Sequence, residues 1–278
     1  MPAYQNNDGL LISNLLSNFE GLIHGITTKS YGNMSSKRIT AGNALEGRNR
    51  LSKVLGIRWE DTIFPEIEHG TNVGVLRRND DIWEIEVRKF AASRIPLDRF
   101  SKGYDAIITQ EKNCFLALAI ADCAPVFVYD PFKQVIGLVH SGLSGTVCGV
   151  VVHTLQLMRQ VFDSNYEDLL ISIGPCISRK YFDISRSTMW NEVLEPNDAF
   201  NRLPKNVFFQ QRNALMFDIR ESIKNDLMDL GVKTQNLEIS ELCTVAHRHK
   251  LYSHYAAGAE GREAQNVEGR FLAIIGMQ

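Results

Sequence analysis

The sequence predicts an α+β fold in a single domain over residues 1–278. Apolar residues make up 44% of the chain and charged residues 22%, which is the balance of a globular protein with a large core. Several strand-like runs are apolar almost throughout, as strands buried on both faces are. The helical segments do not alternate strictly with these runs, and no linker or repeat marks a boundary, so a mixed arrangement is favoured over a doubly wound sheet.

Short runs with the composition of strands recur along the chain. They cover residues 21–27, 106–109, 114–120, 126–129, 135–139, 169–173, 237–240 and 271–276. The polar stretch 77–102 carries alternating charges without a clear period. We expect that stretch to interrupt the fold.

Apolar residues at steps of three and four predict two amphipathic helices. The first starts at Thr146, which is a suitable N-cap, and the second starts at about Asp218 and is ended by Gly231. A third helix is expected over residues 47–55. The first stripe consists of Val147, Val151, Leu155, Met158 and Phe162, and the second of Ile219, Ile223, Leu227 and Leu230.

Charge and cysteine content exclude several classes of protein. Thirty Lys and Arg against 32 Asp and Glu give a net charge of -2, so nucleic acid and membrane are not expected as partners. The first residues lack the basic start and apolar stretch of a signal peptide, and no window has the ~18 apolar residues of a transmembrane helix. Five widely spaced cysteines suit a reducing compartment. We expect a cytoplasmic protein.

A predicted β-hairpin brings a cysteine close to a histidine. Two apolar runs flank a turn that has Asp130 and Pro131 at its first two positions, as a type I turn prefers. If Asp130 opposes Lys133, then Cys123 lies opposite His140, with Cβ atoms about 4.5–5.5 Å apart. Such a pair can bind a metal ion, act as nucleophile and base, or be a buried cysteine beside an unrelated histidine.

The segment after His140 carries two glycines and three hydroxyl groups before the expected helix. Ser141, Gly142 and Thr146 are candidates for binding an anion or sugar hydroxyls, because the first N–H groups of a helix are unpaired. A tight turn with an N-cap is the alternative. His69 is followed by Gly70, but no feature of the residues themselves connects it to Cys123.

Short motifs in order along nearly the whole chain resemble one family, the multicopper polyphenol oxidoreductase or "laccase domain" proteins. Members of that family are associated with zinc-dependent purine nucleoside phosphorylase and adenosine deaminase activity. The motifs are His24-Gly25-Ile26, Asn49-Arg50, Glu68-His69-Gly70, Tyr104-Asp105-Ala106, Ala121-Asp122-Cys123, Val139-His140-Ser141-Gly142, Gly174-Pro175-Cys176, Cys243-Thr244 and Tyr252-Ser253.

The resemblance implies a fold and a metal site. The fold is a layered α-β-β-α sandwich, and the metal ligands are His69, Cys123 and His140, which together bind one zinc ion. Three protein ligands leave a fourth position open, as a catalytic zinc requires. Copper is a possible alternative, because a Cys/His site accepts it readily.

This chain departs from the family pattern at two places. The family usually reads His-Ala-Gly-Trp-Arg-Gly where this chain has Leu143 and Ser144 in place of Trp and Arg, and Ser-Tyr-Arg-Arg where it has Ser253-His254-Tyr255-Ala256. Arginine is the natural bidentate partner of phosphate. The chain therefore resembles a divergent member of the family, and whether phosphate is a co-substrate is left open by these replacements.

The predicted function is that of a zinc enzyme acting on a purine nucleoside, by phosphorolysis of adenosine or inosine, deamination of adenosine, or both. Cys123 and His140 are the predicted catalytic residues, and Asp122 is a candidate proton shuttle. Asn43 and the loop that follows His140 are the candidates for substrate binding. The alternatives are a metal-free Cys–His amide hydrolase or deamidase, a non-catalytic metal-stabilised binding protein, and a copper-dependent polyphenol oxidase.

Overall fold

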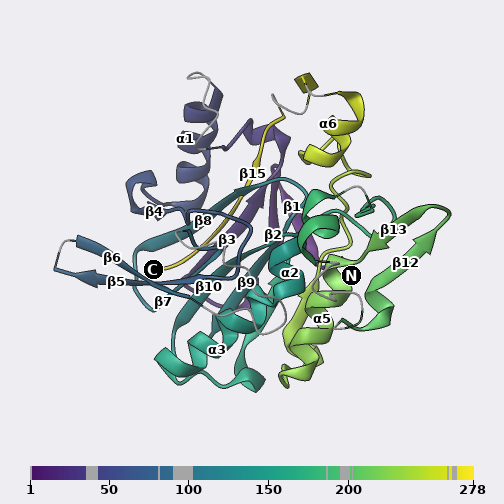
Figure 1. Cartoon of the computed structure of the whole chain (residues 1–278). Helices are drawn as coiled ribbons and strands as arrows, with labels where there is room; N and C mark the ends of the chain where they lie inside the picture. The colour runs from purple at the N-terminus through teal and green to yellow at the C-terminus, as the bar shows by residue number, and fades with distance from the viewer. Residues whose placement is uncertain are drawn as a thin grey trace.

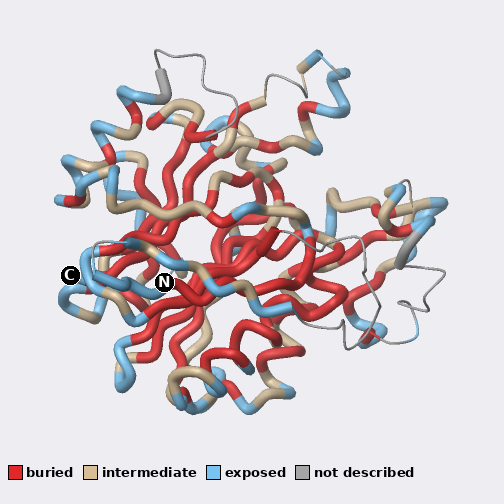
Figure 2. The backbone as a smooth tube through the Cα atoms, turned by 60° about the vertical axis from the view of Figure 1, so that its left-hand side comes forward, coloured by how far each residue is buried: buried red, intermediate tan, exposed pale blue. Residues whose placement is uncertain are grey.

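Two β-sheets packed face to face form the centre of the molecule, and helices cover their outer faces (Figure 1). The computed structural model describes residues 2–35, 43–80, 82–89, 103–185, 187–194, 201, 203–261, 263–264 and 268–278. Figure 2 shows the strands as the buried centre, and the exposed residues gather on the outer helices and turns. No helix in the described part of the chain is long and apolar enough to cross a membrane.

The two large sheets are both mixed. One has six strands, in the order β1 (Tyr4–Asn7), β2 (Leu10–Ser13), β3 (Leu22–Thr27), β15 (Phe271–Met277), β8 (Cys114–Ile120) and β4 (Thr62–Ile63). The other has seven, in the order β14 (Leu237–Ile239), β11 (Leu170–Ile173), β9 (Ala124–Asp130), β10 (Val135–Ser141), β7 (Ala106–Thr109), β5 (Val73–Asn79) and β6 (Ile82–Arg88). A separate hairpin joins β12 (Phe208–Gln211) to β13 (Ala214–Phe217).

The central strands bury both of their faces, which explains why they are apolar almost throughout. In β8, Leu116 and Leu118 point into the core between the sheets, whereas Phe115 packs outward with Leu51 of α1 (Asn43–Leu55). In β9, Phe127 points into the core between the sheets, and its neighbours along the strand pack outward beneath the helices. Helices on both outer faces confirm the α+β class and the α-β-β-α layering.

The expected helix at Thr146 is wrong at its start. Helix α2 (Leu143–Cys148) begins after Gly142, and α3 (Val150–Phe162) follows a break at Gly149, which has φ 85°. The Thr146 hydroxyl is 2.7 Å from the Ser141 hydroxyl and caps neither helix. The periodic stripe had indicated one helix because its residues on both helices pack into the same core cluster.

The helix predicted at Asp218 is confirmed as α5 (Ile219–Asp229). Its N-cap is Asp218, whose carboxylate accepts the backbone N–H of Glu221. The chain leaves the helix through Gly231, which has φ 90°. The last helix, α6 (His254–Glu260), starts after Ser253, which accepts the N–H of Ala256.

The register predicted for the β9–β10 hairpin is wrong by two residues. Asp130 pairs with Val135, not with Lys133, and His140 pairs with Pro125. The turn is longer because Asp130 accepts the N–H groups of Phe132 and Lys133, each at 3.0 Å, and Gln134 adopts φ 53°. Cys123 therefore lies in the turn before β9, and its approach to His140 does not depend on strand pairing.

The polar stretch 77–102 does not interrupt the fold as expected over its first part. Strands β5 and β6 form a regular antiparallel hairpin there, from the pair Val73 and Arg88 to the pair Asn79 and Ile82. Side chains of β6 alternate between exposed and half-buried. Its charged residues are those of a solvated strand face. Residues 90–102 lie outside the described part of the chain.

Candidate metal centre

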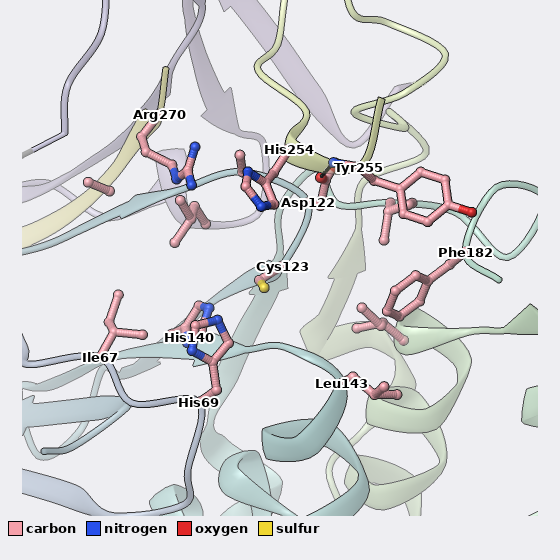
Figure 3. A pocket seen from close by; sticks show the side chains of 15 residues that line it. Ile67, His69, Asp122, Cys123, His140, Leu143, Phe182, His254, Tyr255 and Arg270 are labelled. Atoms are coloured by element: carbon pink, nitrogen blue, oxygen red, sulfur yellow. Dashed lines mark hydrogen bonds between the residues drawn. The ribbon is translucent and has the colours of Figure 1, made fainter. Parts of the chain in front are cut away.

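Three side chains from distant parts of the sequence converge at one end of the two sheets (Figure 3). The ligand atoms of His69, Cys123 and His140 all lie within 4.8 Å of one another. The His69 and His140 rings are perpendicular, at 87°, with centroids 4.9 Å apart. His69 comes from the loop before β5, Cys123 from the turn that joins β8 to β9, and His140 from β10.

The donor set fits a transition-metal ion. Zinc binds imidazole nitrogen and thiolate sulfur at about 2.0–2.3 Å, so a small closing movement of these side chains would place all three on one ion. The thiolate and imidazoles are also ligands that copper accepts. Three protein donors would leave a bound ion able to take a water molecule or a substrate atom, as a catalytic ion requires.

Asp105 orients the metal-site residues, and the sequence argument gave it no role. It is 1% exposed, and its Oδ1 accepts Nδ1–H of His140 at 2.8 Å, so that Nε2 of His140 is the nitrogen left for a metal ion. The same carboxylate accepts the backbone N–H groups of Glu68, His69 and Gly70 at 3.3, 2.9 and 2.7 Å. One buried carboxylate thus positions two of the three ligands.

Two residues of the site have a backbone that L-residues rarely adopt. His69 has φ 62° and Asp122 has φ 76°. Such conformations cost on the order of 1 kcal/mol or more each and persist where surrounding contacts enforce them. The Asp105 bonds hold His69, and bonds from three donors hold Asp122. The strained backbone therefore lies at His69 itself and at the residue that precedes Cys123.

The charges of Cys123 and His140 are coupled. Burial opposes a charge on Cys123, but the imidazoles of His140 and His69 outweigh it and lower the pKa of the thiol to about 6. Burial likewise opposes a charge on His140, but the Cys123 thiolate and the Asp105 carboxylate raise the pKa of its ring to about 10. Cys123 is thus held in the thiolate form, which is the form that binds metals.

We expect Cys123 to be the reactive thiol of the metal-free protein. Its rate of alkylation by iodoacetamide should rise with pH around a midpoint near 6, because the thiolate is the nucleophile. Burial raises the pKa of Cys176 to about 11 and that of Cys114 to about 12, so these thiols should stay unlabelled. Peptide mapping across a pH series measures this, with Cys123→Ser as the control. A midpoint near the ordinary 8.5 would contradict the coupling.

A cavity of about 370 Å³ opens beside the three ligands (Figure 3). This volume is within the range of small-molecule sites, which is about 300–1,000 Å³. Its apolar wall is formed by Leu143, Ile177, Phe182, Ile219 and Tyr255. Arg270 and His254 line it as well, and Asp122 is the one carboxylate among the described lining residues.

The predicted proton shuttle, Asp122, lines the cavity but has three partners. Its Oδ1 accepts the hydroxyls of Thr244 and Ser253, and its Oδ2 accepts the N–H of Tyr255 at 2.7 Å. Asp122 therefore joins the cysteine turn to the start of α6. Its part in proton transfer remains a prediction.

The predicted substrate-binding residues lie in different surroundings. The hydroxyls of Ser141 and Thr146 bond each other and are buried, and neither residue lines the cavity. Gly142 packs directly on the metal ligands. Asn43 begins α1, but its side chain lies outside the described residues. The cavity's Arg270 and Phe182 were not predicted, because no local motif places them near Cys123.

At Gly142 the side chains of the candidate metal ligands leave little room for a Cβ atom. A Cβ atom there would lie 3.0 Å from Cys123 Sγ and 3.4 Å from Cδ2 of His69. We expect Gly142→Ala to weaken zinc binding by about 10- to 100-fold, as changes beside metal ligands typically do. The Tm of the metal-free protein should hardly change, because φ -90° and ψ -170° suit alanine. Competition with a zinc chelator measures the affinity, and unchanged binding would show that the ligands meet elsewhere.

Comparison with known proteins places the chain in a family. The family described as multi-copper polyphenol oxidoreductase laccase matches residues 24–278. The chain belongs to this family. His69, Cys123 and His140 and the described residues that line the cavity all fall within the matched range.

Relatives of known sequence include bacterial proteins that carry an enzyme name. Purine nucleoside phosphorylase YlmD of Bacillus subtilis is 33% identical over 64% of this chain, an alignment that spans 60% of that relative's length. A purine nucleoside phosphorylase of Bacteroides thetaiotaomicron is 28% identical, over 94% of this chain and 93% of its own. The crystal structure of YlmD from Geobacillus stearothermophilus matches all of both chains with a TM-score of 0.76 at 23% identity, which confirms the fold.

Proposed function

We propose that this protein is a metal-dependent purine nucleoside phosphorylase. The observation that carries the proposal is the convergence of His69, Cys123 and His140 on a cavity that also holds the cation of Arg270. The names of the relatives supply the substrate class, because purine nucleoside phosphorylase is the name they share. We propose zinc as the metal, with copper as the alternative.

The reaction is the exchange of a base for phosphate at the sugar. A phosphate oxygen forms a bond to C1′ of the ribose, the C1′–N bond breaks with its electron pair going to the purine, and the purine takes up a proton. When bound, the metal ion supplies Lewis-acid stabilisation of developing negative charge. Asp105 holds His140 in position for that ion, and the apolar wall excludes water that would compete with phosphate.

Arg270 provides the positive charge that phosphate needs in this chain. The sequence lacks the arginines that the family carries at the positions of Ser144 and Tyr255, but Arg270 lines the same cavity from the residue before β15. Asp122 is proposed to pass a proton from water to the base, taking the proton up on its carboxylate before the purine receives it. Its bonds to Thr244 and Ser253 are links through which a proton could be replaced.

Chromatography of the products from adenosine and inosine, with and without phosphate, tests the proposal. Wild type should release free base only when phosphate is present, and Cys123→Ala should release none. Formation of inosine from adenosine without phosphate would show deamination instead. Release of base at the same rate without phosphate would show hydrolysis and refute phosphorolysis.

A second candidate is a metal-free Cys–His hydrolase that acts on amides. The Asp105–His140 bond of 2.8 Å and the lowered pKa of Cys123 favour it, because a nucleophile, base and orienting carboxylate stand in series. His69→Ala separates the two candidates. It would leave the hydrolase active and abolish metal-dependent turnover. A non-catalytic binding protein would instead show a thermal shift with adenosine and no product.

A further inference from the structure

The cavity beside the metal ligands has two chemically different ends (Figure 3). Phe182 and Tyr255 meet edge to face, with ring centroids 6.5 Å apart and planes at 84°. In Figure 3 these rings lie on one side of Cys123, and the guanidinium of Arg270 lies on the other. One end therefore offers flat apolar surface, and the other offers positive charge.

The backbone of Tyr255 is anchored beside Cys123, and its ring is not part of the core. Its backbone N–H donates to Oδ2 of Asp122 at 2.7 Å, and Asp122 directly precedes Cys123. The residue is nevertheless 39% exposed, so its ring surface is available to a ligand. Because the backbone bond does not involve the ring, a change of side chain at 255 leaves the anchor in place.

Phe182 is held by contacts of its own, with a different part of the chain. Its ring packs on Phe217, at 6.4 Å between centroids, and its backbone C=O accepts the N–H of Phe217 at 3.0 Å. The ring remains half-buried and lines the cavity. Two rings from different parts of the chain thus make one corner of the cavity, which Leu143 also lines (Figure 3).

We propose that the Phe182–Tyr255 corner binds the flat heterocycle of the substrate and that Arg270 binds its anionic partner, which fixes one orientation across the metal ligands. Aromatic rings stack with any base face, and a guanidinium pairs with an oxyanion through two hydrogen bonds. The reverse orientation would place an oxyanion against two ring faces whose only side-chain donor is the Tyr255 hydroxyl, away from the guanidinium charge. The identity of the heterocycle and the anion rests on the proposed function. The orientation rests on the cavity itself.

This orientation suits an exchange at the sugar. With the base at the rings and phosphate at Arg270, the bond that forms and the bond that breaks lie on opposite sides of the ribose. The reacting carbon then lies near His69, Cys123 and His140. Tyr255 and Phe182 would act as specificity-determining residues of this chain.

Equilibrium binding of the two separate parts of the reaction tests the proposal without turnover. Free adenine and inorganic phosphate are titrated in turn into the zinc-loaded protein by calorimetry. We expect Tyr255→Leu and Phe182→Leu each to weaken adenine binding by roughly tenfold, which is within the range of base–aromatic stacking. Phosphate binding should stay within about twofold. Tyr255→Phe should bind adenine as wild type does, because it keeps the ring.

Arg270→Gln should show the opposite pattern. Phosphate binding should weaken by roughly tenfold or more, as for a lost charge-assisted pair, with adenine binding nearly unchanged. Phe132→Leu and Arg159→Gln are matched controls, since both residues are exposed and outside the cavity. Neither control should affect either ligand. Zinc content and Tm of every variant establish that the site is intact.

Several results would overturn the orientation. The orientation is wrong if Arg270→Gln loses adenine binding or if Tyr255→Leu loses phosphate binding. It is also wrong if neither ring variant weakens adenine binding, or if the wild type binds neither adenine nor phosphate. The proposed function is judged separately. If adenine binding depends on the rings but no phosphorolysis is found, the proposed function is refuted and the orientation stands. If phosphorolysis is found but adenine binding does not depend on the rings, the orientation is refuted and the proposed function stands. If Phe182→Leu does not fold, the two Tyr255 variants decide.

Discussion

Cys123→Ala is expected to lose its metal ion and its phosphorolytic activity together. The thiolate is one of only three protein ligands in the described site, and its loss leaves two imidazoles. Because a bound metal ion contributes several kcal/mol to charge stabilisation, turnover should fall by about 10³-fold or more. Elemental analysis of the purified variant and base release from inosine measure the two effects.

His69→Ala distinguishes a metal enzyme from a metal-free Cys–His hydrolase, which the Cys123→Ala variant alone cannot do. His69 is the most exposed of the three ligands, and its hydrogen bond to the Asp105 carboxylate comes from its backbone N–H and not from its ring. Its removal should therefore leave the Cys123–His140–Asp105 series intact while weakening the metal site. Loss of metal and turnover in His69→Ala confirms a metal enzyme. Full activity with loss of metal would favour the Cys–His hydrolase.

Asp105→Ala is expected to be the most destabilising single change at the site. It would leave the N–H groups of Glu68, His69 and Gly70 and Nδ1 of His140 without their acceptor. Each buried unsatisfied donor costs about 1–3 kcal/mol, so a loss of roughly 3 kcal/mol or more in the free energy of unfolding is expected. Denaturant unfolding of the metal-free variant measures it.

Asp105→Asn separates charge from packing. The amide keeps an acceptor oxygen but carries no charge, so it should retain much of the stability and weaken zinc binding by about 10- to 100-fold. Asp163→Asn, an exposed carboxylate paired with Lys133, is the control and should change neither property. If Asp105→Asn bound zinc as tightly as the wild type, the charge of Asp105 would have no part in metal binding, and its role would be limited to holding the loop at residues 68–70.

The pH dependence of stability follows from the same carboxylate. Burial raises the pKa of Asp105, but the His140 bond and the Gly70 N–H outweigh it and hold that pKa below its ordinary value. A lowered carboxylate pKa contributes stability that is present above the unfolded value, about 4, and is lost as the pH falls below it. The acid limb of the wild-type stability curve should therefore be steeper than that of Asp105→Asn.

The α+β class could be predicted because strands that are buried on both faces have a recognisable composition, whereas the α-β-β-α layering came from the family resemblance. Strands such as β8 and β9 must be apolar at nearly every position, and a run of this kind is visible without any structure. The hairpin register was wrong because Asp130 and Gln134 set the turn by a side-chain acceptor and a left-handed backbone. Neither feature follows from strand composition.

The metal ligands could be identified only in part from the residues themselves. Cys123 and His140 flank one hairpin, so their approach was predicted even though its geometry was wrong. His69 was connected to them through family resemblance. Asp105 was missed because its four partners come from residues 35–37 positions earlier or 35 later, and no local pattern records such contacts. Phe182, Tyr255 and Arg270 meet at the cavity for the same long-range reason.

Zinc titration of the metal-free wild type tests the central claim most directly. Bound zinc and the phosphate-dependent rate of base release from inosine are measured in the same samples. We predict no activity without metal, a linear rise to one equivalent of zinc per chain, and no rise in Cys123→Ala. Full activity in protein shown to contain no metal, or activity that ignores the first equivalent, would contradict a catalytic metal at His69, Cys123 and His140.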